Sequence, residues 1–325
     1  MFQKLLMQFF QAIQSILNLL NLKIQIMNLL SSYAILLKVN QTGAFVLMLK
    51  NKKNICVLGG NDNLTNTFYR YCKKKFYKAI YINFSNKKIA RNLDKDIFHL
   101  HLYELKKCLN ILEKNNIDEI VLLGKISRPD LSKFKLDGII DQYLDILINA
   151  YKKGDGEILK IIISIFVERG FKVVPIKHLT SNFSFSRGSK NIIFNKNNSD
   201  QEDINKALRI LNDLSKHDNA QSIVLDNGFI LAIEAAEGTD EMLNRVHRYK
   251  KKLGLHKKNN GILVKLPKKS QSLKVDLPVI GPKTIKLLKK AKINSLAVNK
   301  KNTLINNLDK TLKEIEKNRI NLYLI

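Results

Sequence analysis

The chain has 325 residues, of which 56 are Lys or Arg and 28 are Asp or Glu, so its formal net charge is +28. This length is typical of two domains, and the 45% content of apolar residues excludes a chain that is disordered throughout. The three cysteines, Cys56, Cys72 and Cys108, form neither a disulfide framework nor a metal-ligand spacing. They therefore predict a reduced intracellular protein without a structural zinc site.

The positive charge is carried mainly by lysine. Only nine of the 56 basic residues are Arg, and Arg makes most bidentate contacts with phosphates and base edges. We therefore interpret most of the charge as compositional background, with an anionic lipid surface or a phosphorylated substrate as the alternative. Residues 201–245 contain nine acids and four bases, whereas residues 247–301 contain 17 Lys or Arg and one acid, Asp276. Such neighbouring blocks could present metal-binding carboxylates beside phosphate-binding lysines.

Residues 1–47 differ from the rest, because they contain no Asp or Glu and only three Lys. The uncharged run at 5–22 is interrupted by Gln, Ser and Asn, and a good membrane-spanning helix needs about 20 mainly apolar residues. An amphipathic helix at a membrane surface is an alternative. We favour a start at Met48, which predicts that residues 1–47 are an extension outside the fold.

The first half of the chain alternates between predicted strands and helices. Strands are predicted at 54–58, 78–84, 118–123 and 171–176, and helices at 64–75, 103–115, 138–151 and 157–169. This order is typical of a parallel sheet with crossover helices. It predicts an α/β fold with a Rossmann-like N-terminal domain over residues 48–182. The polar, Asn- and Ser-rich segment 182–200 is the predicted boundary.

The second half predicts a different, α+β domain over residues 183–325. A helix is predicted at 200–217, and strands at 222–225 and 229–233 flank Asn227-Gly228, which favours a tight hairpin turn. A further helix begins near Thr239 or Asp240. The remaining predicted elements are a strand at 261–266, a helix at 283–292, a strand at 295–298, a helix at 308–316 and a strand at 321–325.

Two loops of the first half have residues suited to phosphate. Gly59, Gly60 and Asn61 follow the first predicted strand, where backbone N–H groups can approach an anion at a helix start. A tight turn without a ligand explains them equally well. The loop at 124–130 follows the third predicted strand, and ligands of open α/β sheets bind at the carboxyl ends of strands. Alternatively, the loop at 124–130 is a solvated loop without a ligand. The candidate binding residues in this loop are Lys125, Ser127, Arg128 and Asp130.

Three further segments contain candidate residues. Gly154 and Asp155 fit a sharp turn as well as a ligand site. The segment 234–240 contains three carboxylates, which are ligands of the kind that Mg²⁺ takes, although Thr239 and Asp240 can also cap the following helix. Asp276 stands alone among lysines beside a rigid Pro-Gly-Pro turn, and the alternative is a carboxylate that caps that turn.

Several common motifs are missing from the sequence. There is no GxxxxGK[ST] phosphate-binding loop, no HExxH metal motif and no GxSxG nucleophile turn. Of the six His, only His99 and His101 are close together, and no third ligand accompanies them. We interpret these two as structural.

Six motifs in the same order give a more specific indication. They are GKISRPD (124–130), KGDGE (153–157), VERGFKVV (167–174), AIEAAEGTDEML (232–243), GILVKLPK (261–268) and VDLPVIGP (275–282). In order and spacing, along residues 52–325, the sequence resembles the UDP-2,3-diacylglucosamine pyrophosphatases of the LpxI type.

The resemblance implies a Mg²⁺-dependent hydrolase of lipid A biosynthesis. Its substrate would be the lipid-linked UDP-sugar UDP-2,3-diacylglucosamine, cleaved at the pyrophosphate to UMP and 2,3-diacylglucosamine 1-phosphate between two domains. We expect a cytoplasmic protein, peripherally associated with the inner-membrane surface and without a nucleic-acid partner, and a homodimer is left open.

The resemblance also implies roles for individual residues. It makes Asp276 the essential carboxylate and adds Glu237, Asp240 and Lys265 as catalytic residues, with Asp276, Glu237 and Asp240 as the metal ligands. The expected substrate-binding residues are Gly59, Gly60, Asn61, Lys125, Ser127, Arg128, Asp130, Gly154, Asp155, Gln221, Gly238 and Thr239.

Two other functions remain as alternatives. One is a non-catalytic, lysine-rich protein that binds a membrane surface or nucleic acid, which would not need Asp276. The other is a nucleotide-sugar oxidoreductase that uses the Rossmann-like half. The lack of an acidic residue at the end of the second predicted strand is an argument against this oxidoreductase.

Overall fold

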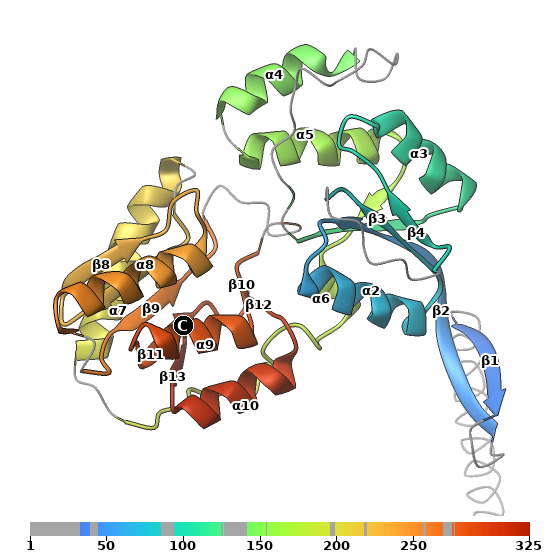
Figure 1. The fold of residues 1–325 in the computed structure, drawn as a ribbon. Helices are drawn as coiled ribbons and strands as arrows, with labels where there is room; N and C mark the ends of the chain where they lie inside the picture. The colour runs from blue at the N-terminus through green and yellow to red at the C-terminus, as the bar shows by residue number, and fades with distance from the viewer. Residues whose placement is uncertain are drawn as a thin grey trace, which may run out of the picture.

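The chain folds into two parts, each built around its own sheet (Figure 1). The computed structural model describes residues 33–39, 45–85, 94–124, 126, 142–153, 155–195, 199–217, 220–255, 258–268, 275 and 277–325. For residues 33–39, 45–52, 153 and 155 it describes only the backbone.

Within the described residues, the N-terminal sheet has five parallel strands in the order β4-β3-β2-β5-β6. The chain moves outward from β2 in one direction and then returns to the other side of β2 with β5. This is the order of a doubly wound fold, which confirms the predicted Rossmann-like α/β class. The strands are β2 (Phe45–Gly59), β3 (Phe76–Asn83), β4 (Ile97–His99), β5 (Glu119–Leu123) and β6 (Lys172–Val173).

Helices cover both faces of this sheet, so its central strands are apolar on both sides. Ile55 and Val57 of β2 pack in one cluster with α2, whereas Cys56 and Leu58 pack in the opposite cluster with α3 and α5. This alternation is the period of two of an extended strand. The helices are α2 (Asn63–Lys75), α3 (Leu105–Lys114), α4 (Leu144–Lys153), α5 (Asp155–Glu168) and α6 (Ile176–Leu179).

A two-stranded ribbon precedes the sheet. Strand β1 (Tyr33–Val39) pairs in antiparallel register with the first half of β2, and the ribbon points away from the helices and the sheet (Figure 1). The pairing of β2 with β3 becomes regular only from Asn54, after a register shift. The sequence did not predict β1, and the assignment of residues 1–47 to an extension stays a prediction.

The C-terminal part contains a mixed sheet, in the order β13-β11-β9-β7-β8 within the described residues. Strands β9, β11 and β13 are parallel, and β7 runs antiparallel to both β8 and β9. The backbone φ angles of 50° at Asn227 and 81° at Gly228 confirm the predicted hairpin turn. The strands are β7 (Ser222–Asp226), β8 (Phe229–Ile233), β9 (Ile262–Lys265), β11 (Ser295–Val298) and β13 (Asn321–Leu324).

Helices again cover both faces of this second sheet. Helix α7 packs on one face, and α8, α9 and α10 pack on the other. A small parallel pair, β10 (Val279–Ile280) with β12 (Leu304–Ile305), lies outside the main sheet. The helices are α7 (Ser199–Leu214), the short 3₁₀ helix η3 (Ser215–His217), α8 (Thr239–Lys252), α9 (Pro282–Lys290) and α10 (Leu308–Asn318).

The two parts share apolar contacts. Leu277 and Leu304 of the C-terminal part are buried in the cluster that α2 forms on the N-terminal sheet. Phe183 lies in the same cluster, and its carbonyl oxygen accepts a 2.8 Å hydrogen bond from the backbone N–H of Ile305. The predicted boundary segment is therefore held by packing as well as by its covalent connections.

No helix in these described ranges is both long and apolar enough to cross a bilayer.

Gly59 provides a test of the N-terminal sheet. A Cβ atom at this position would lie 1.9 Å from the carbonyl oxygen of Leu123, so Gly59→Ala must push β2 and β5 apart. We expect a loss of unfolding free energy of about 2 kcal/mol or more, measured by urea denaturation. The control is Gly188→Ala, because no atom lies within 4 Å of its added Cβ. Equal stability of the two variants would contradict this close packing.

Candidate active site

The carboxyl ends of β2 and β5 meet at the centre of the N-terminal sheet. Gly59 is paired with Leu123, and the chain leaves these two strands towards opposite edges. Open α/β sheets bind ligands at such a point, where the strand order reverses. The structure thus brings together two predicted features, the glycine turn at 59–61 and the start of the loop at 124–130.

The turn after β2 is held by its own side chains. The Tyr81 hydroxyl donates a 2.6 Å hydrogen bond to the Gly60 carbonyl oxygen, and Asn61 Oδ1 accepts from Asn66 Nδ2 at 2.9 Å. Asp62 caps α2 by accepting a 2.9 Å hydrogen bond from the backbone N–H of Thr65. A carboxylate at the helix start repels a phosphate there. The geometry therefore favours a rigid turn over anion binding at the N-terminus of α2.

A buried polar cluster lies at the carboxyl end of β9 in the C-terminal part. Lys265, the last residue of β9, is the register partner of Ser222, the first residue of β7. Glu234 directly follows β8, and Thr239 is the first residue of α8. All four side chains belong to buried residues, with exposed fractions of 0 to 8%. We call these four residues the hydroxyl-bridged cluster.

Hydrogen bonds connect all four residues of the cluster. Lys265 Nζ donates to Thr239 Oγ1 at 2.6 Å, and Thr239 Oγ1 donates to Glu234 Oε2 at 3.1 Å. The Ser222 hydroxyl donates to the same carboxylate oxygen. A buried ammonium and a buried carboxylate are thus both hydrogen-bonded, as burial of charged groups requires.

Gln221 lies next to this cluster, one residue before Ser222. Its side-chain oxygen Oε1 is buried and has no hydrogen-bond partner. An unsatisfied buried acceptor costs about 1–3 kcal/mol, so such a group needs an explanation. The predicted substrate residue Gln221 therefore has a buried acceptor that a donor of a ligand could satisfy, and its backbone carbonyl oxygen accepts a 2.8 Å hydrogen bond from the N–H of Leu266, the residue after Lys265.

Glu237 and Asp240 lie in the same segment, but each is paired with a cation. Arg245 donates to Glu237 Oε1 at 2.7 Å. The backbone N–H of Glu237 itself and then the Arg245 guanidinium hold the pKa of the Glu237 carboxyl below its usual range. Asp240 Oδ2 lies 2.7 Å from Lys283 Nζ, and this hydrogen bond raises the pKa of Lys283.

A magnesium site is not formed by the described carboxylates. Among the residues that the structure describes, no group of three or more His, Cys, Asp or Glu side chains is arranged to hold a metal ion. Glu237 and Asp240 face cations instead, and Glu234 is occupied by two hydroxyls. The predicted set of three ligands also includes Asp276, which lies outside the described residues.

Several other predicted residues also lie outside the described part of the chain. Asp155 begins α5, but its side chain is not described. Gly238, in contrast, is described and is the N-cap residue of α8. The two neighbours of Asp276 are described. Val275 packs against the α3 and α5 cluster of the N-terminal sheet, and Leu277 packs in the α2 cluster. The predicted residues outside the description are Lys125, Ser127, Arg128, Asp130 and Gly154.

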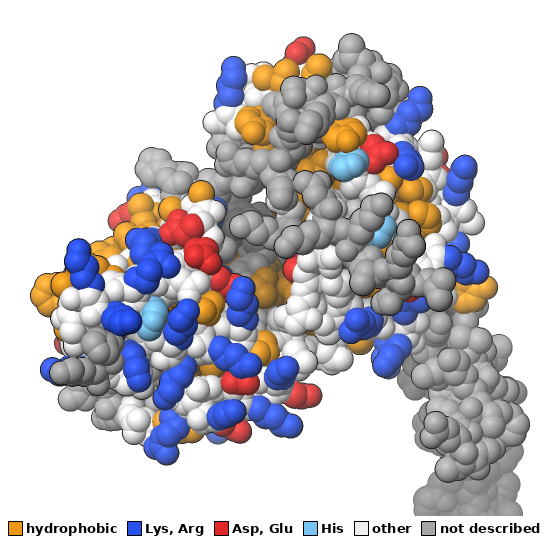
Figure 2. All heavy atoms as spheres, in the orientation of Figure 1, with side chains coloured by type: hydrophobic (Ala, Val, Ile, Leu, Met, Phe, Trp, Pro, Cys, Tyr) orange, Lys and Arg blue, Asp and Glu red, His pale blue; other side chains and the backbone are white. Residues whose placement is uncertain are grey.

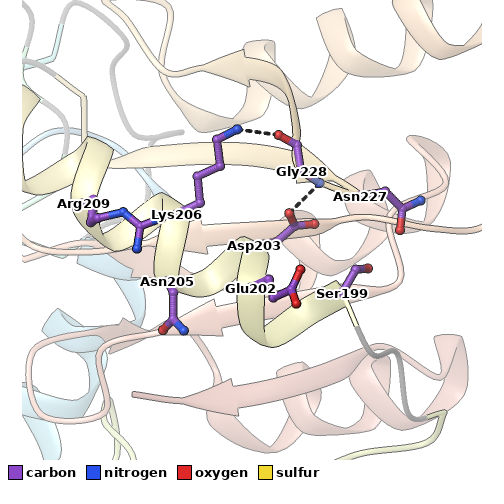
Figure 3. A pocket seen from close by; sticks show the side chains of 8 residues that line it. All are labelled: Ser199, Glu202, Asp203, Asn205, Lys206, Arg209, Asn227 and Gly228. Atoms are coloured by element: carbon purple, nitrogen blue, oxygen red, sulfur yellow. Dashed lines mark hydrogen bonds between the residues drawn. The ribbon is translucent and has the colours of Figure 1, made fainter.

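A hollow lies at the opposite end of β7 from the hydroxyl-bridged cluster, between α7 and the hairpin turn (Figure 3). Lys206 Nζ donates to the Gly228 carbonyl oxygen and Asp203 Oδ1 accepts from the Gly228 N–H, both at 2.7 Å. Burial raises the pKa of Asp203, although the backbone hydrogen bond from Gly228 partly opposes this effect. These polar groups satisfy one another and anchor the turn to α7, so we interpret this hollow as structural.

Comparison with known proteins decides the family. The model of the LpxI N-terminal domain matches residues 54–183, and that of the LpxI C-terminal domain matches residues 191–323. The chain belongs to the LpxI family. This confirms the resemblance found in the sequence motifs. The chain is also 33% identical, over 183 residues, to the UDP-2,3-diacylglucosamine pyrophosphatase LpxI of Caulobacter vibrioides. That alignment covers 56% of this chain and 65% of the Caulobacter protein, which is just under two thirds.

Two residues of the hydroxyl-bridged cluster were not among the predicted site residues. Glu234 was considered only as one of three carboxylates in its segment, and Ser222 was not considered. The sequence signal that pointed towards them was the hairpin, which places the start of β7 close to the end of β8.

The pairing of Glu237 with Arg245 gives a pH prediction. In Arg245→Gln the carboxylate loses a positive partner, so the pKa of Glu237 should rise towards its usual value. NMR titration of the labelled carboxyl carbon measures this shift. Because the folded-state pKa is lowered, Glu237 stabilises the native state above its unfolded-state pKa. That contribution is lost as the pH falls through the folded-state pKa.

The control is Arg248→Gln, which removes an exposed Arg from the same helix. This variant should leave the titration of Glu237 unchanged. An unchanged pKa of Glu237 in Arg245→Gln would show that the ion pair does not control this carboxylate.

Proposed function

We propose that this protein hydrolyses the pyrophosphate bond of UDP-2,3-diacylglucosamine in lipid A synthesis, giving UMP and 2,3-diacylglucosamine 1-phosphate. One observation carries the proposal: both LpxI domains are matched, in order, in a chain that resembles the Caulobacter pyrophosphatase. The structure supports it with a buried ammonium at the end of β9 and an α/β switch point in the other domain.

We propose that Lys265 stabilises the negative charge that develops on the phosphoryl group. A fixed cation in a site that excludes water is worth more than the same cation in solvent, because less solvent screens it. Lys265 is only 5% exposed and its position is fixed by Thr239. Arg128 of the loop after β5 would be a second cation for the same charge.

The nucleotide half of the substrate would bind at the switch point of the N-terminal sheet. Gly59, Gly60 and Asn61 would form one wall there, and the loop at 124–130 would form the other. Since Asp62 already caps α2, we expect this turn to contact an uncharged part of the nucleotide. The phosphates would then lie closer to Lys265.

Mg²⁺ dependence is a further part of the proposal, and it depends on Asp276. The described carboxylates do not suffice to hold the ion, so Asp276 would have to supply the main ligand, with Glu237 and Asp240 exchanging their cationic partners. If bound, Mg²⁺ would polarise the pyrophosphate.

We also propose that the protein works in the cytoplasm at the surface of the inner membrane. A diacylated sugar is held in a bilayer by its chains, and an excess of lysine favours anionic lipid. Lys and Arg side chains cover much of the visible face of the C-terminal part (Figure 2). Acidic side chains gather on its flank towards the N-terminal part in the same view.

The test is the release of UMP from UDP-2,3-diacylglucosamine in mixed micelles by the full chain. We expect Asp276→Asn to lower kcat by about 100-fold or more, as loss of an essential electrostatic group does. Asp213→Asn, the same change at an exposed residue, should keep full activity. Failure of the wild-type chain to release UMP would overturn the proposal, and full activity of Asp276→Asn would remove Asp276 from the chemistry.

A chelator tests the metal separately. If Mg²⁺ is required, EDTA should abolish UMP release from the wild-type chain, and added Mg²⁺ should restore it. Unchanged release in EDTA would overturn the metal requirement and leave the hydrolase assignment in place.

A further inference from the structure

The hydroxyls of Thr239 and Ser222 both contact the Glu234 carboxylate. Thr239 has a single hydroxyl proton, and it is donated to Glu234 Oε2. Its oxygen therefore faces Lys265 as an acceptor, and Lys265 Nζ donates to it at 2.6 Å. An ionised Glu234 cannot donate, so it accepts in both of its hydrogen bonds with the hydroxyls.

We infer that Glu234 is a positioning residue for Lys265: it orients the ammonium through the Thr239 hydroxyl, and Ser222 in turn holds the Glu234 carboxylate. The inference rests on the proposed function, because it concerns the cation that we assign to the phosphoryl group. No role for Glu234 or Ser222 follows from the family resemblance.

A second buried lysine in the same part of the chain shows what a structural role looks like. Lys250 is 1% exposed, and its three N–H donors have three acceptors. They are Asp226 Oδ2 at 3.2 Å and the carbonyl oxygens of Asn260 and Lys292 at 2.7 and 3.0 Å. The carboxylate there contacts the ammonium directly. At Lys265, in contrast, a neutral hydroxyl lies between the ammonium and Glu234.

This difference has a physical consequence. Because the Thr239 hydroxyl lies between the two charges, the Glu234 carboxylate is close enough to favour the charged form of Lys265. At the same time, Glu234 does not contact Nζ directly. The arrangement suits a lysine that must stay charged and aimed at a phosphate.

The test compares substitutions that keep the shape of each side chain. Glu234→Gln keeps the size and removes the charge, and Thr239→Val removes the bridging hydroxyl, whereas Thr239→Ser retains it. We expect Glu234→Gln and Thr239→Val to lower kcat by about 10–100-fold, as loss of a supporting residue does at other sites. KM should change less than kcat. Thr239→Ser should retain most of the wild-type activity, because it keeps the hydroxyl.

The matched control is Glu241→Gln, the same change at an exposed residue in the first turn of α8. It should leave kcat and KM unchanged. Wild-type activity of both Glu234→Gln and Thr239→Val would overturn the inference. So would equal losses in Thr239→Ser and Thr239→Val, because a packing role does not require the hydroxyl.

A second measurement does not depend on activity. The ammonium of Lys265 can be titrated by nitrogen-15 NMR, with its signal assigned by its loss in Lys265→Arg. Removing the nearby negative charge in Glu234→Gln should lower the pKa of Lys265 by about one unit or more, and Glu241→Gln should not change it. This titration decides the inference even if the wild-type chain releases no UMP. A pKa that is the same in Glu234→Gln and in the wild type would overturn it.

Discussion

The C-terminal part is organised around the burial of two opposite charges at one edge of its sheet. Lys265 and Glu234 both lie away from water, and each would be strongly unfavourable without hydrogen bonds. The hydroxyls of Thr239 and Ser222 supply these bonds. Because the four residues come from β7, β9, the end of β8 and the start of α8, satisfying the charges also fixes where the helix begins. The start of α8 in turn determines the positions of Asp240 and Glu241 in its first turn.

The N-terminal part meets a steric requirement instead. Two strands approach so closely at Gly59 and Leu123 that a side chain is excluded, and this contact defines the switch point. The two candidate halves of the site therefore differ in kind. One is a tight backbone turn whose helix cap is the carboxylate of Asp62, and the other is a buried cluster that contains both a cation and a carboxylate. Val275 and Leu277, on either side of Asp276, connect the second half to the clusters of the first.

Much of the fold could be predicted from local pattern. Helices such as α2 have apolar residues at helical spacing and a capping Asp62, and β2 alternates between two buried faces. Elements that depend on distant partners were missed. Strands β10 and β12 have two residues each and exist only because they pair with each other. The strand predicted at 171–176 is limited to Lys172–Val173, because Pro175 is the N-cap of α6, which begins at Ile176.

The site could be predicted less completely, and a β-bulge shows why. An unbroken hairpin around Asn227-Gly228 would place Ser222 opposite Ile233, with Glu234 beyond the pair. A register shift between Val224 and Leu225 instead pairs Ile223 with Ile233, so Glu234 comes next to Ser222. Nothing in the local sequence marks this shift. The cationic partners of Glu237 and Asp240 were also missed, because Lys283 comes from another helix and Arg245 lies two turns along α8.

The contact between the two parts has a consequence for how this family can change over evolution. Leu277 and Leu304 fill the cluster in which the Phe68 and Phe183 rings meet edge to face at 5.6 Å. These residues belong to different halves of the gene, yet a change in one half alters the packing of the other. A half taken from a distant relative would bring side chains that do not fit this contact. Recombination between relatives should therefore succeed only when both sides of this apolar contact come from the same parent.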